Sequence, residues 1–174
     1  MWTFSQHWSW AIVIIFAAVP LFLSRTGNRA QPLKVGNDWW LIVAGVVLCF
    51  LLADQGSVHL FKEQFHRLRP CHAIENVRMF MTHCGGKYGF VSSHAANAFA
   101  LCVFLCRCWR KKERVWPGVL LVLWALLTCY SRAYLGKHYP GDLLCGAVFG
   151  CVIGLGVSLL KEYVAKKMQI AGTK

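Results

Sequence analysis

Two histidines in short polar stretches are the side chains best suited to chemistry. The first, His94, follows Ser92 and Ser93 immediately before an apolar run. A serine pair ahead of such a run predicts the start of a helix, and the free N–H groups and dipole at a helix start favour an anion. The imidazole of His94 would then lie in the first helical turn, within reach of a bound phosphate.

The second histidine, His138, precedes a carboxylate at a spacing that favours contact. Pro140 and Gly141 interrupt the chain, and Asp142 stands four residues after the histidine. A carboxylate at this spacing can accept a hydrogen bond from one ring nitrogen and keep the other unprotonated, as the acid of a catalytic triad does for its base. The pattern therefore favours a histidine with one nitrogen available for chemistry.

A third polar stretch offers cations. Lys62 and Arg69 are seven residues apart, so on a helix they would share one face about two turns apart. Pro70 is expected to end that helix, because proline cannot continue the backbone ladder. Two cations that point the same way suit a dianionic headgroup, although cations that snorkel from a helix end explain this pair alone at least as well. The other basic side chains of this segment are expected to be solvated or to line the access route for a headgroup: His66, Arg67, His72, Arg78 and His83.

Taken together, the three stretches resemble the signature motifs of the type 2 phosphatidic acid phosphatase superfamily. The matching positions are Lys62 with Arg69-Pro70, Ser92-Ser93-His94, and Ser131-Arg132 with His138 and Asp142. Their order and spacing agree, including six residues between the lysine and the arginine and five between the arginine and the histidine. The second motif usually reads Pro-Ser-Gly-His, so Val91 and Ser93 depart from it. A serine supplies the same backbone N–H as the glycine and adds a hydroxyl, which affects fine geometry rather than activity.

The resemblance implies a membrane lipid phosphatase that forms a covalent intermediate. His138 would attack phosphorus and become a phosphohistidine, while Asp142 fixes its tautomer and stabilises its positive charge. His94 would protonate the departing lipid oxygen and then activate water. The phosphate oxygens would be bound by the N–H groups of the helix start together with three cations and two serines, namely Lys62, Arg69, Arg132, Ser92 and Ser93.

Neither a metal nor another cofactor is expected. Three cations already supply the positive charge that a phosphoryl group needs, and the carboxylates of the polar segments are too few and too scattered for a two-metal site. These carboxylates are Asp54, Glu63, Glu75 and Asp142.

The nine cysteines do not share one role. Six lie in apolar runs and are expected to pack as small hydrophobic side chains, and Cys108 lies at the inner edge beside the basic cluster 107–114. Cys71 and Cys84 lie in the polar 58–90 segment, where an oxidising exterior would let them form a disulfide that closes a short loop; the alternative is that both stay reduced. Zinc is not indicated, since CxxC and HxxxH spacings are absent from the sequence.

Apolar segments must hold these residues in place. Hydrophobic residues make up 57% of the chain and charged residues 15%, with a mean hydropathy of +0.46, whereas a soluble domain carries about a quarter charged residues. Five runs approach the length of a spanning helix; they cover residues 8–23, 39–53 and onward, 90–106, 115–129 and 143–160. They predict an all-α, polytopic membrane bundle of about five helices in a single domain, 1–174. Membrane members of the family typically have six spans, and a sixth would precede residue 1.

The distribution of positive charge predicts the orientation of this bundle. Twelve of the nineteen Lys and Arg residues lie in the connections 25–34, 107–114 and 161–174, and the other seven lie in 58–90 and 132–141. Positive residues stay cytoplasmic during insertion. We therefore expect a multi-pass protein of the bacterial inner (cytoplasmic) membrane with its active site at the outer interface, facing the periplasm or exterior. The net charge of +12 does not indicate nucleic acid; the expected partners are a phosphorylated lipid and the bilayer.

Several alternatives stay open. A vanadate haloperoxidase of the same superfamily is opposed by the membrane spans, and an inactive lipid-binding or transport protein is opposed by the intact His94, His138 and Asp142. A lipid phosphotransferase, which passes the phosphate to another acceptor, fits the same residues. Among substrates, undecaprenyl diphosphate is favoured, lipid A is second, and phosphatidylglycerophosphate and phosphatidic acid follow.

Overall fold

The computed structural model of the chain describes residues 39–74, 84–108 and 116–171. The predicted span 8–23 lies outside these residues, and so do Glu75, Arg78 and His83. The described part is helical, as predicted, and its only pairing of strand type is an isolated bridge between Leu68 and Tyr88. The elements in chain order are α2 (Trp39–Gly56), the π-helix η2 (Ser57–Lys62), α3 (Glu63–Phe65), α4 (Pro70–Ala73), α5 (Ser93–Cys108), α6 (Trp116–Tyr134) and α7 (Pro140–Ala171).

Three of the described helical segments are long and apolar enough to cross a membrane. They cover Trp40–Phe65, Pro117–Tyr134 and Pro140–Ile170, so α2, η2 and α3 act as one rod. The predicted span 90–106 forms α5, which begins at Ser93 rather than at 90 and has 16 residues. At 1.5 Å per residue α5 is roughly 24 Å long, shorter than the hydrocarbon core of a bilayer.

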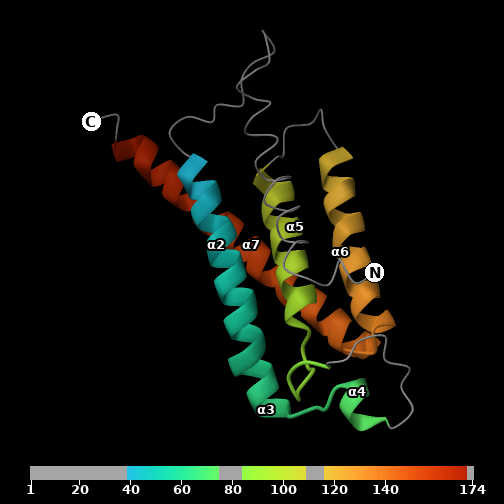
Figure 1. Cartoon of the computed structure of the whole chain (residues 1–174). Coiled ribbons are helices and arrows are strands. Elements are labelled where there is room, and N and C mark those ends of the chain that lie inside the picture. The colour runs from blue at the N-terminus through green and yellow to red at the C-terminus, as the bar shows by residue number, and fades with distance from the viewer. Residues whose placement is uncertain (1–38, 75–83, 109–115, 172–174) are drawn as a thin grey trace.

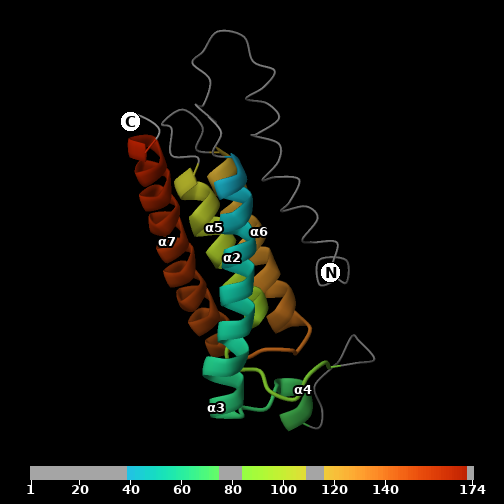
Figure 2. The ribbon, with the colours of Figure 1, turned by 90° about the vertical axis from the view of Figure 1, so that its left-hand side faces the viewer.

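The short helix α5 forms the centre of the bundle. It packs against α2, α6 and α7, and Figures 1 and 2 show it enclosed by these three longer segments. Leu101, Phe104 and Leu105 of α5 are completely buried. The outer faces of its neighbours instead expose large apolar side chains, such as Val47 on α2 and Val148 on α7. An apolar exterior around an apolar core is what a helical bundle in lipid requires.

Small residues let α7 approach α5 closely. Gly146, Gly150 and Gly154 recur every four residues, so they share one face of α7. A Cβ at Gly150 would overlap the carbonyl oxygen of Ala96, and a Cβ at Gly154 would overlap that of Ala100. This is the small-residue packing that membrane helices use where their backbones meet.

The helix predicted to carry both Lys62 and Arg69 ends earlier than expected. It stops at Phe65, because His66 takes a left-handed conformation with φ 47°, and Arg69 is extended. Pro70 therefore begins α4 instead of ending the preceding helix. The physical reason is that proline disfavours helical backbone for the residue before it but suits the first position of a helix. The prediction for this segment was wrong, and the two cations come from separate elements.

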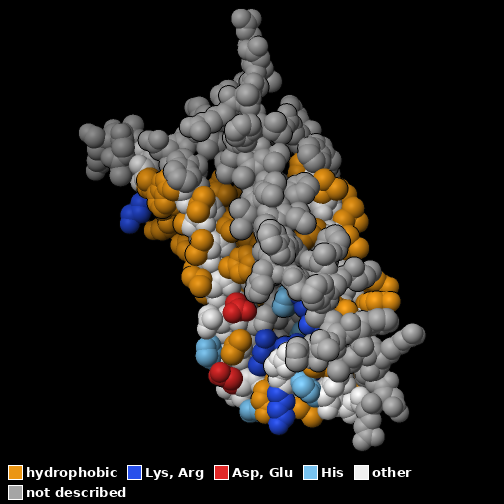
Figure 3. Space-filling model, in the orientation of Figure 1, with side chains coloured by type: hydrophobic (Ala, Val, Ile, Leu, Met, Phe, Trp, Pro, Cys, Tyr) orange, Lys and Arg blue, Asp and Glu red, His pale blue; other side chains and the backbone are white. Residues whose placement is uncertain are grey.

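The polar connections gather at one end of the bundle. The segments 66–69 and 84–92 and the turn at 135–139 lie beside the first turns of α5 and α7, at the bottom of Figure 1. In Figure 3 most of the Lys, Arg and His side chains on the visible face lie at this end, below a zone of hydrophobic side chains. The predicted chemistry therefore belongs to one end of the described structure.

The glycine face of α7 gives a first prediction. Gly150→Ala should destabilise the bundle by about 1–3 kcal/mol, because its Cβ forces α7 away from α5, and this should lower the thermal unfolding temperature in detergent. Gly156→Ala is the matched control, since nothing lies within 4 Å of a Cβ there. Equal unfolding temperatures for the two variants would contradict the packing described.

Candidate functional site

The first turns of α5 and α7 bring two of the polar stretches together. The backbone N–H of Ser92 donates to the carbonyl oxygen of Asp142 at 3.1 Å. The hydroxyl of Ser92 accepts a hydrogen bond from the N–H of Ala95 at 3.4 Å, so Ser92 caps α5 and the predicted helix start is confirmed. The helix that carries His94 thus begins beside the carboxylate that follows His138.

His138 and Asp142 form a buried pair. Nδ1 of His138 lies 3.8 Å from Oδ2 of Asp142, longer than a hydrogen bond but within ion-pair range, and both side chains are almost inaccessible. Burial lowers the pKa of the His138 imidazole below its usual range; Asp142 opposes this shift and the cation of Arg69 reinforces it. The imidazole is therefore held neutral, the form in which a ring nitrogen can act as a nucleophile.

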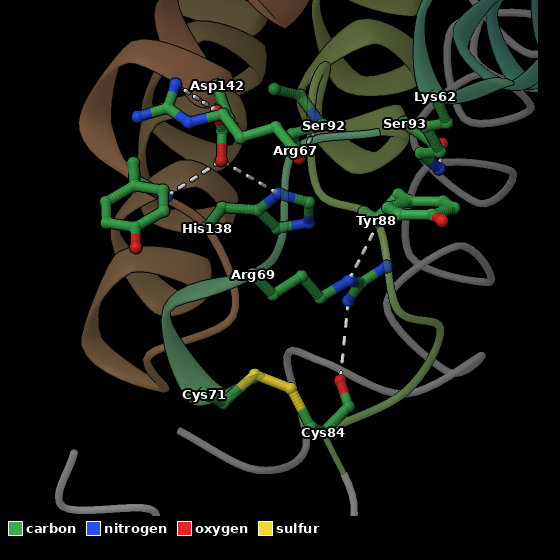
Figure 4. Close-up of polar contacts among 12 residues, drawn as sticks. Lys62, Arg67, Arg69, Cys71, Cys84, Tyr88, Ser92, Ser93, His138 and Asp142 are labelled. Atoms are coloured by element: carbon green, nitrogen blue, oxygen red, sulfur yellow. Dashed lines mark hydrogen bonds and ion pairs between the residues drawn. A yellow bond between two sulfur atoms is a disulfide. The ribbon is translucent and has the colours of Figure 1, made fainter. Parts of the chain in front are cut away.

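Arg67 supplies a partner for Asp142 that the sequence analysis missed. Its NH1 donates to Oδ1 of Asp142 at 3.0 Å, and the carboxylate is fully buried whereas Arg67 is 47% exposed. The guanidinium also lies over the ring of Tyr139, 4.5 Å from its centroid, while the Tyr139 N–H donates to Oδ2 of Asp142 at 3.0 Å. Figure 4 shows Arg67 and His138 on different sides of this carboxylate.

Arg69 is clamped by backbone carbonyl groups. Its Nε donates to Tyr88 at 3.2 Å and its NH1 to Cys84 at 3.4 Å. A disulfide joins Cys84 to Cys71, which follows Pro70 directly (Figure 4). The loop that orients the guanidinium is thus tied covalently to the loop that carries it.

Gly89 allows this loop to lie close to the buried pair. A Cβ there would lie 3.1 Å from Cγ of Arg69 and 3.4 Å from Oδ2 of Asp142. The neighbouring backbone is fixed as well, because the N–H of Gly89 donates to the carbonyl oxygen of Arg67 at 2.8 Å. A side chain at position 89 would crowd Arg69 and Asp142, so glycine is favoured there.

Lys62 reaches the site from the end of η2. Its Nζ donates to the hydroxyl of Ser93 at 2.6 Å. That hydroxyl also lies 2.5 Å from the hydroxyl of Ser57, a buried residue that the sequence analysis did not single out. The first polar stretch therefore meets the second at the first residue of α5.

His94 and Arg132 complete the cluster. Arg132, near the end of α6, is 4% exposed. The charges of Arg132, Lys62 and Arg69 all act on His94, and so does His138. The structure thus brings together all eight predicted catalytic and phosphate-binding residues: His94, His138, Asp142, Lys62, Arg69, Arg132, Ser92 and Ser93.

The charges of this cluster favour an anion. Three cations surround a site whose one buried carboxylate is already engaged by Arg67 and by the Tyr139 N–H. Within the described ranges, the one group of side chains with metal-ligating donors close together is Cys71, His72 and Cys84, and its two sulfur atoms are joined to each other. The arrangement at His138 therefore suits a dianionic phosphate held by charge-assisted hydrogen bonds.

Known proteins resemble the chain over most of its length. The model of the PAP2 superfamily matches residues 38–166. A lipid A 4′-phosphatase of Porphyromonas gingivalis is 34% identical over 155 residues, which cover 86% of this chain and 60% of that protein. A lipid A 4′-phosphatase of Bacteroides thetaiotaomicron is 41% identical over 112 residues, 62% of this chain and 48% of that protein. The chain thus spans about half to three fifths of the length of these two relatives.

A relative with another named activity and a solved structure are also similar. The undecaprenyl-diphosphatase BcrC of Bacillus subtilis is 37% identical over 144 residues, which cover 83% of this chain and 64% of that protein. The crystal structure of Aquifex aeolicus LpxE superposes with a TM-score of 0.53 at 19% identity, over 87% of this chain and 86% of that chain. The similarity to Aquifex aeolicus LpxE shows a shared fold.

The pairing of Arg67 with Asp142 gives a second prediction. Arg67→Gln should lower the stability of the protein by about 1.5–3 kcal/mol, because a buried carboxylate loses a charged hydrogen-bond donor. Thermal unfolding in detergent measures the effect. In an Asp142→Asn background the same substitution should cost little, since no buried charge remains. Lys87→Gln, which removes an exposed cation of the same region, is the control; an equal loss in both backgrounds would show that Arg67 acts elsewhere.

Proposed function

Because this chain belongs to the PAP2 superfamily, we propose that it is a membrane enzyme that removes phosphate from a lipid through a phosphohistidine intermediate. One observation carries this proposal: the buried pair of His138 and Asp142 lies in the same cluster as His94 and three cations. A nucleophile, an acid and a set of positive charges are the parts that phosphoryl transfer by a histidine requires.

The first half of the reaction forms a bond from His138 to phosphorus. Nε2 is the attacking atom, because Nδ1 faces Asp142. As the P–N bond forms, the P–O bond to the lipid breaks, and His94, protonated once the negative phosphate offsets the surrounding cations, gives its proton to the departing oxygen. The imidazole of His138 becomes positively charged, and the carboxylate of Asp142 stabilises that charge.

The second half releases the phosphate. His94, now neutral, accepts a proton from water while the water oxygen attacks phosphorus and the P–N bond breaks. Through both halves the negative charge on the equatorial oxygens is balanced by Lys62, Arg69 and Arg132. The N–H groups at the start of α5 add donors for the same oxygens.

The substrate is a phosphorylated membrane lipid, and lipid A is the first candidate. Two relatives at 34% and 41% identity are named lipid A 4′-phosphatases, and on this support we rank lipid A ahead of the undecaprenyl diphosphate that the sequence analysis favoured. Undecaprenyl diphosphate stays the second candidate, because a relative at 37% identity is named for it. Both lipids present a phosphate at the membrane interface, where the site end of the bundle would lie.

We also propose that the site faces the outer side of the inner membrane. The described helix ends that adjoin the connections 25–34, 107–114 and 161–174 lie at the end of the bundle opposite the site (Figure 1); they are Trp39, Cys108, Trp116 and Ala171. These connections hold twelve of the nineteen Lys and Arg residues, and positively charged connections stay cytoplasmic. A disulfide between Cys71 and Cys84 beside Arg69 fits an oxidising compartment such as the periplasm.

The third prediction tests the activity and ranks the substrates. Detergent-purified protein with EDTA present should release phosphate from lipid A or undecaprenyl diphosphate faster than from phosphatidylglycerophosphate or phosphatidic acid. His138→Ala should lower the rate by about a thousandfold or more, and His94→Ala should also abolish turnover. His59→Ala, which alters an exposed histidine paired with Glu63, should leave the rate unchanged. Activity that survives His138→Ala would overturn the mechanism.

The fourth prediction concerns pH. Since burial lowers the pKa of His138, its imidazole stays neutral below the ordinary histidine value of about 6.5. The acid limb of kcat/KM should therefore lie below that pH. Asp142 raises the pKa of His138, so Asp142→Asn should move this limb to lower pH while it reduces the rate. Glu63→Gln is the control, and a limb that moves to higher pH in Asp142→Asn would contradict the assignment.

A further inference from the structure

Ser57 makes a contact that links two separate elements of the site. It is completely buried, and its hydroxyl donates to the carbonyl oxygen of Asp54 at 2.8 Å. The same oxygen lies 2.5 Å from the hydroxyl of Ser93, thirty-six residues further along the chain. Ser158 makes the same local bond to the carbonyl three residues earlier, at 2.7 Å, but on a part of α7 remote from the site end.

The direction of these hydrogen bonds follows from counting hydrogens. A serine hydroxyl has one hydrogen to donate. The hydrogen of Ser57 is used on the carbonyl of Asp54, so Ser57 must accept the hydrogen of Ser93. The oxygen of Ser93 is then left to accept from the ammonium group of Lys62, at 2.6 Å. The chain of donors therefore runs from Lys62 through Ser93 and Ser57 to a backbone carbonyl.

The π-helix explains why Ser57 and Lys62 meet the same partner. They are the first and last residues of η2, five positions apart, and a π-helix places residues at this spacing one turn apart. In an α-helix with 3.6 residues per turn, five positions would rotate the two side chains about 140° away from each other. The wider turn thus lets both side chains face the start of α5.

We propose that Ser57 is a positioning residue that holds the ammonium group of Lys62 at the phosphate site through the hydroxyl of Ser93. The inference rests on the proposed function in that Lys62 is taken to bind the phosphate. Lysine has a flexible stem of four carbons, and without Ser93 its ammonium group would have to be ordered when the phosphate arrives. Figure 4 shows Lys62 and Ser93 side by side at the start of α5.

In this arrangement Ser92 and Ser93 have different roles. The hydroxyl of Ser93 has no hydrogen left for a phosphate, so its contribution to an anion is its backbone N–H and its hold on Lys62. Ser92 caps the helix. The hydroxyl that Ser93 adds to the family pattern is therefore useful only while Ser57 accepts its hydrogen.

A double-mutant cycle tests the proposal. The affinity for orthovanadate, a phosphate mimic, would be measured by equilibrium binding to the purified protein, so that the result does not depend on turnover. Ser57→Ala should weaken binding by about three- to tenfold, the effect expected for loss of one neutral hydrogen bond. Ser93→Ala should weaken it by at least as much. Adding Ser57→Ala to Ser93→Ala should change nothing further.

The control and the contrary outcomes separate positioning from stability. Ser158→Ala removes an equally buried hydroxyl with the same local bond and should leave vanadate affinity unchanged. Ser57→Cys keeps the shape of the side chain with a much weaker hydrogen-bonding group, and it replaces Ser57→Ala if the latter does not fold. The proposal would be overturned if the fold-losses in vanadate affinity of Ser57→Ala and Ser93→Ala multiplied in the double variant. It would also be overturned if Ser57→Ala lowered thermal stability but left the affinity unchanged. Vanadate binding without release of phosphate from any lipid would refute the proposed function. The double-mutant cycle would still decide whether Ser57 positions Lys62, because it measures binding and not turnover.

Discussion

The close approach of α5 and α7 is the constraint on which the site depends. A Cβ at Gly146 would lie 2.7 Å from the carbonyl oxygen of Ser92, so the two backbones meet without an intervening side chain at the depth where both helices begin. The hydrogen bond from Ser92 to the carbonyl of Asp142 then becomes possible. Through this contact the serine pair and His94 on one helix, and the carboxylate on the other, occupy fixed positions. Only the short turn at 135–139 remains to bring His138 to them.

The shortness of α5 decides where this meeting point lies. α5 has only 16 residues, so its first turn does not reach the site end of the rod formed by α2, η2 and α3. That rod extends further, to Phe65. Lys62 therefore contacts Ser93 from the flank of a longer helix, and the loop of Arg69 closes over the site from the rod's end. A phosphate bound there would be surrounded by protein on several sides, which reduces competition from water and strengthens each charged hydrogen bond.

Local patterns predicted the parts of the site that lie at helix ends, and missed those that depend on contacts between distant segments. The cap at Ser92 follows from two serines before an apolar run. The pairing of Arg67 with Asp142 joins residues 75 positions apart, a contact that no local spacing in the sequence indicates. The π-helix at Ser57 has no signature in the apolar run that contains it. The glycines of α7, in contrast, recur every four residues and could have predicted the helix contact.

The partners of the cations explain how a positive site can be ordered before its anion arrives. Lys62 is held by a hydroxyl, and Arg69 by the carbonyl groups of Tyr88 and Cys84. These acceptors are neutral, so they orient the side chains without cancelling their charge. A carboxylate in the same place would bind more strongly but would compete with the phosphate. Asp142, the one buried carboxylate among the described residues, is instead paired with Arg67 and directed at His138. The attraction for phosphate and the activation of the nucleophile thus depend on separate groups.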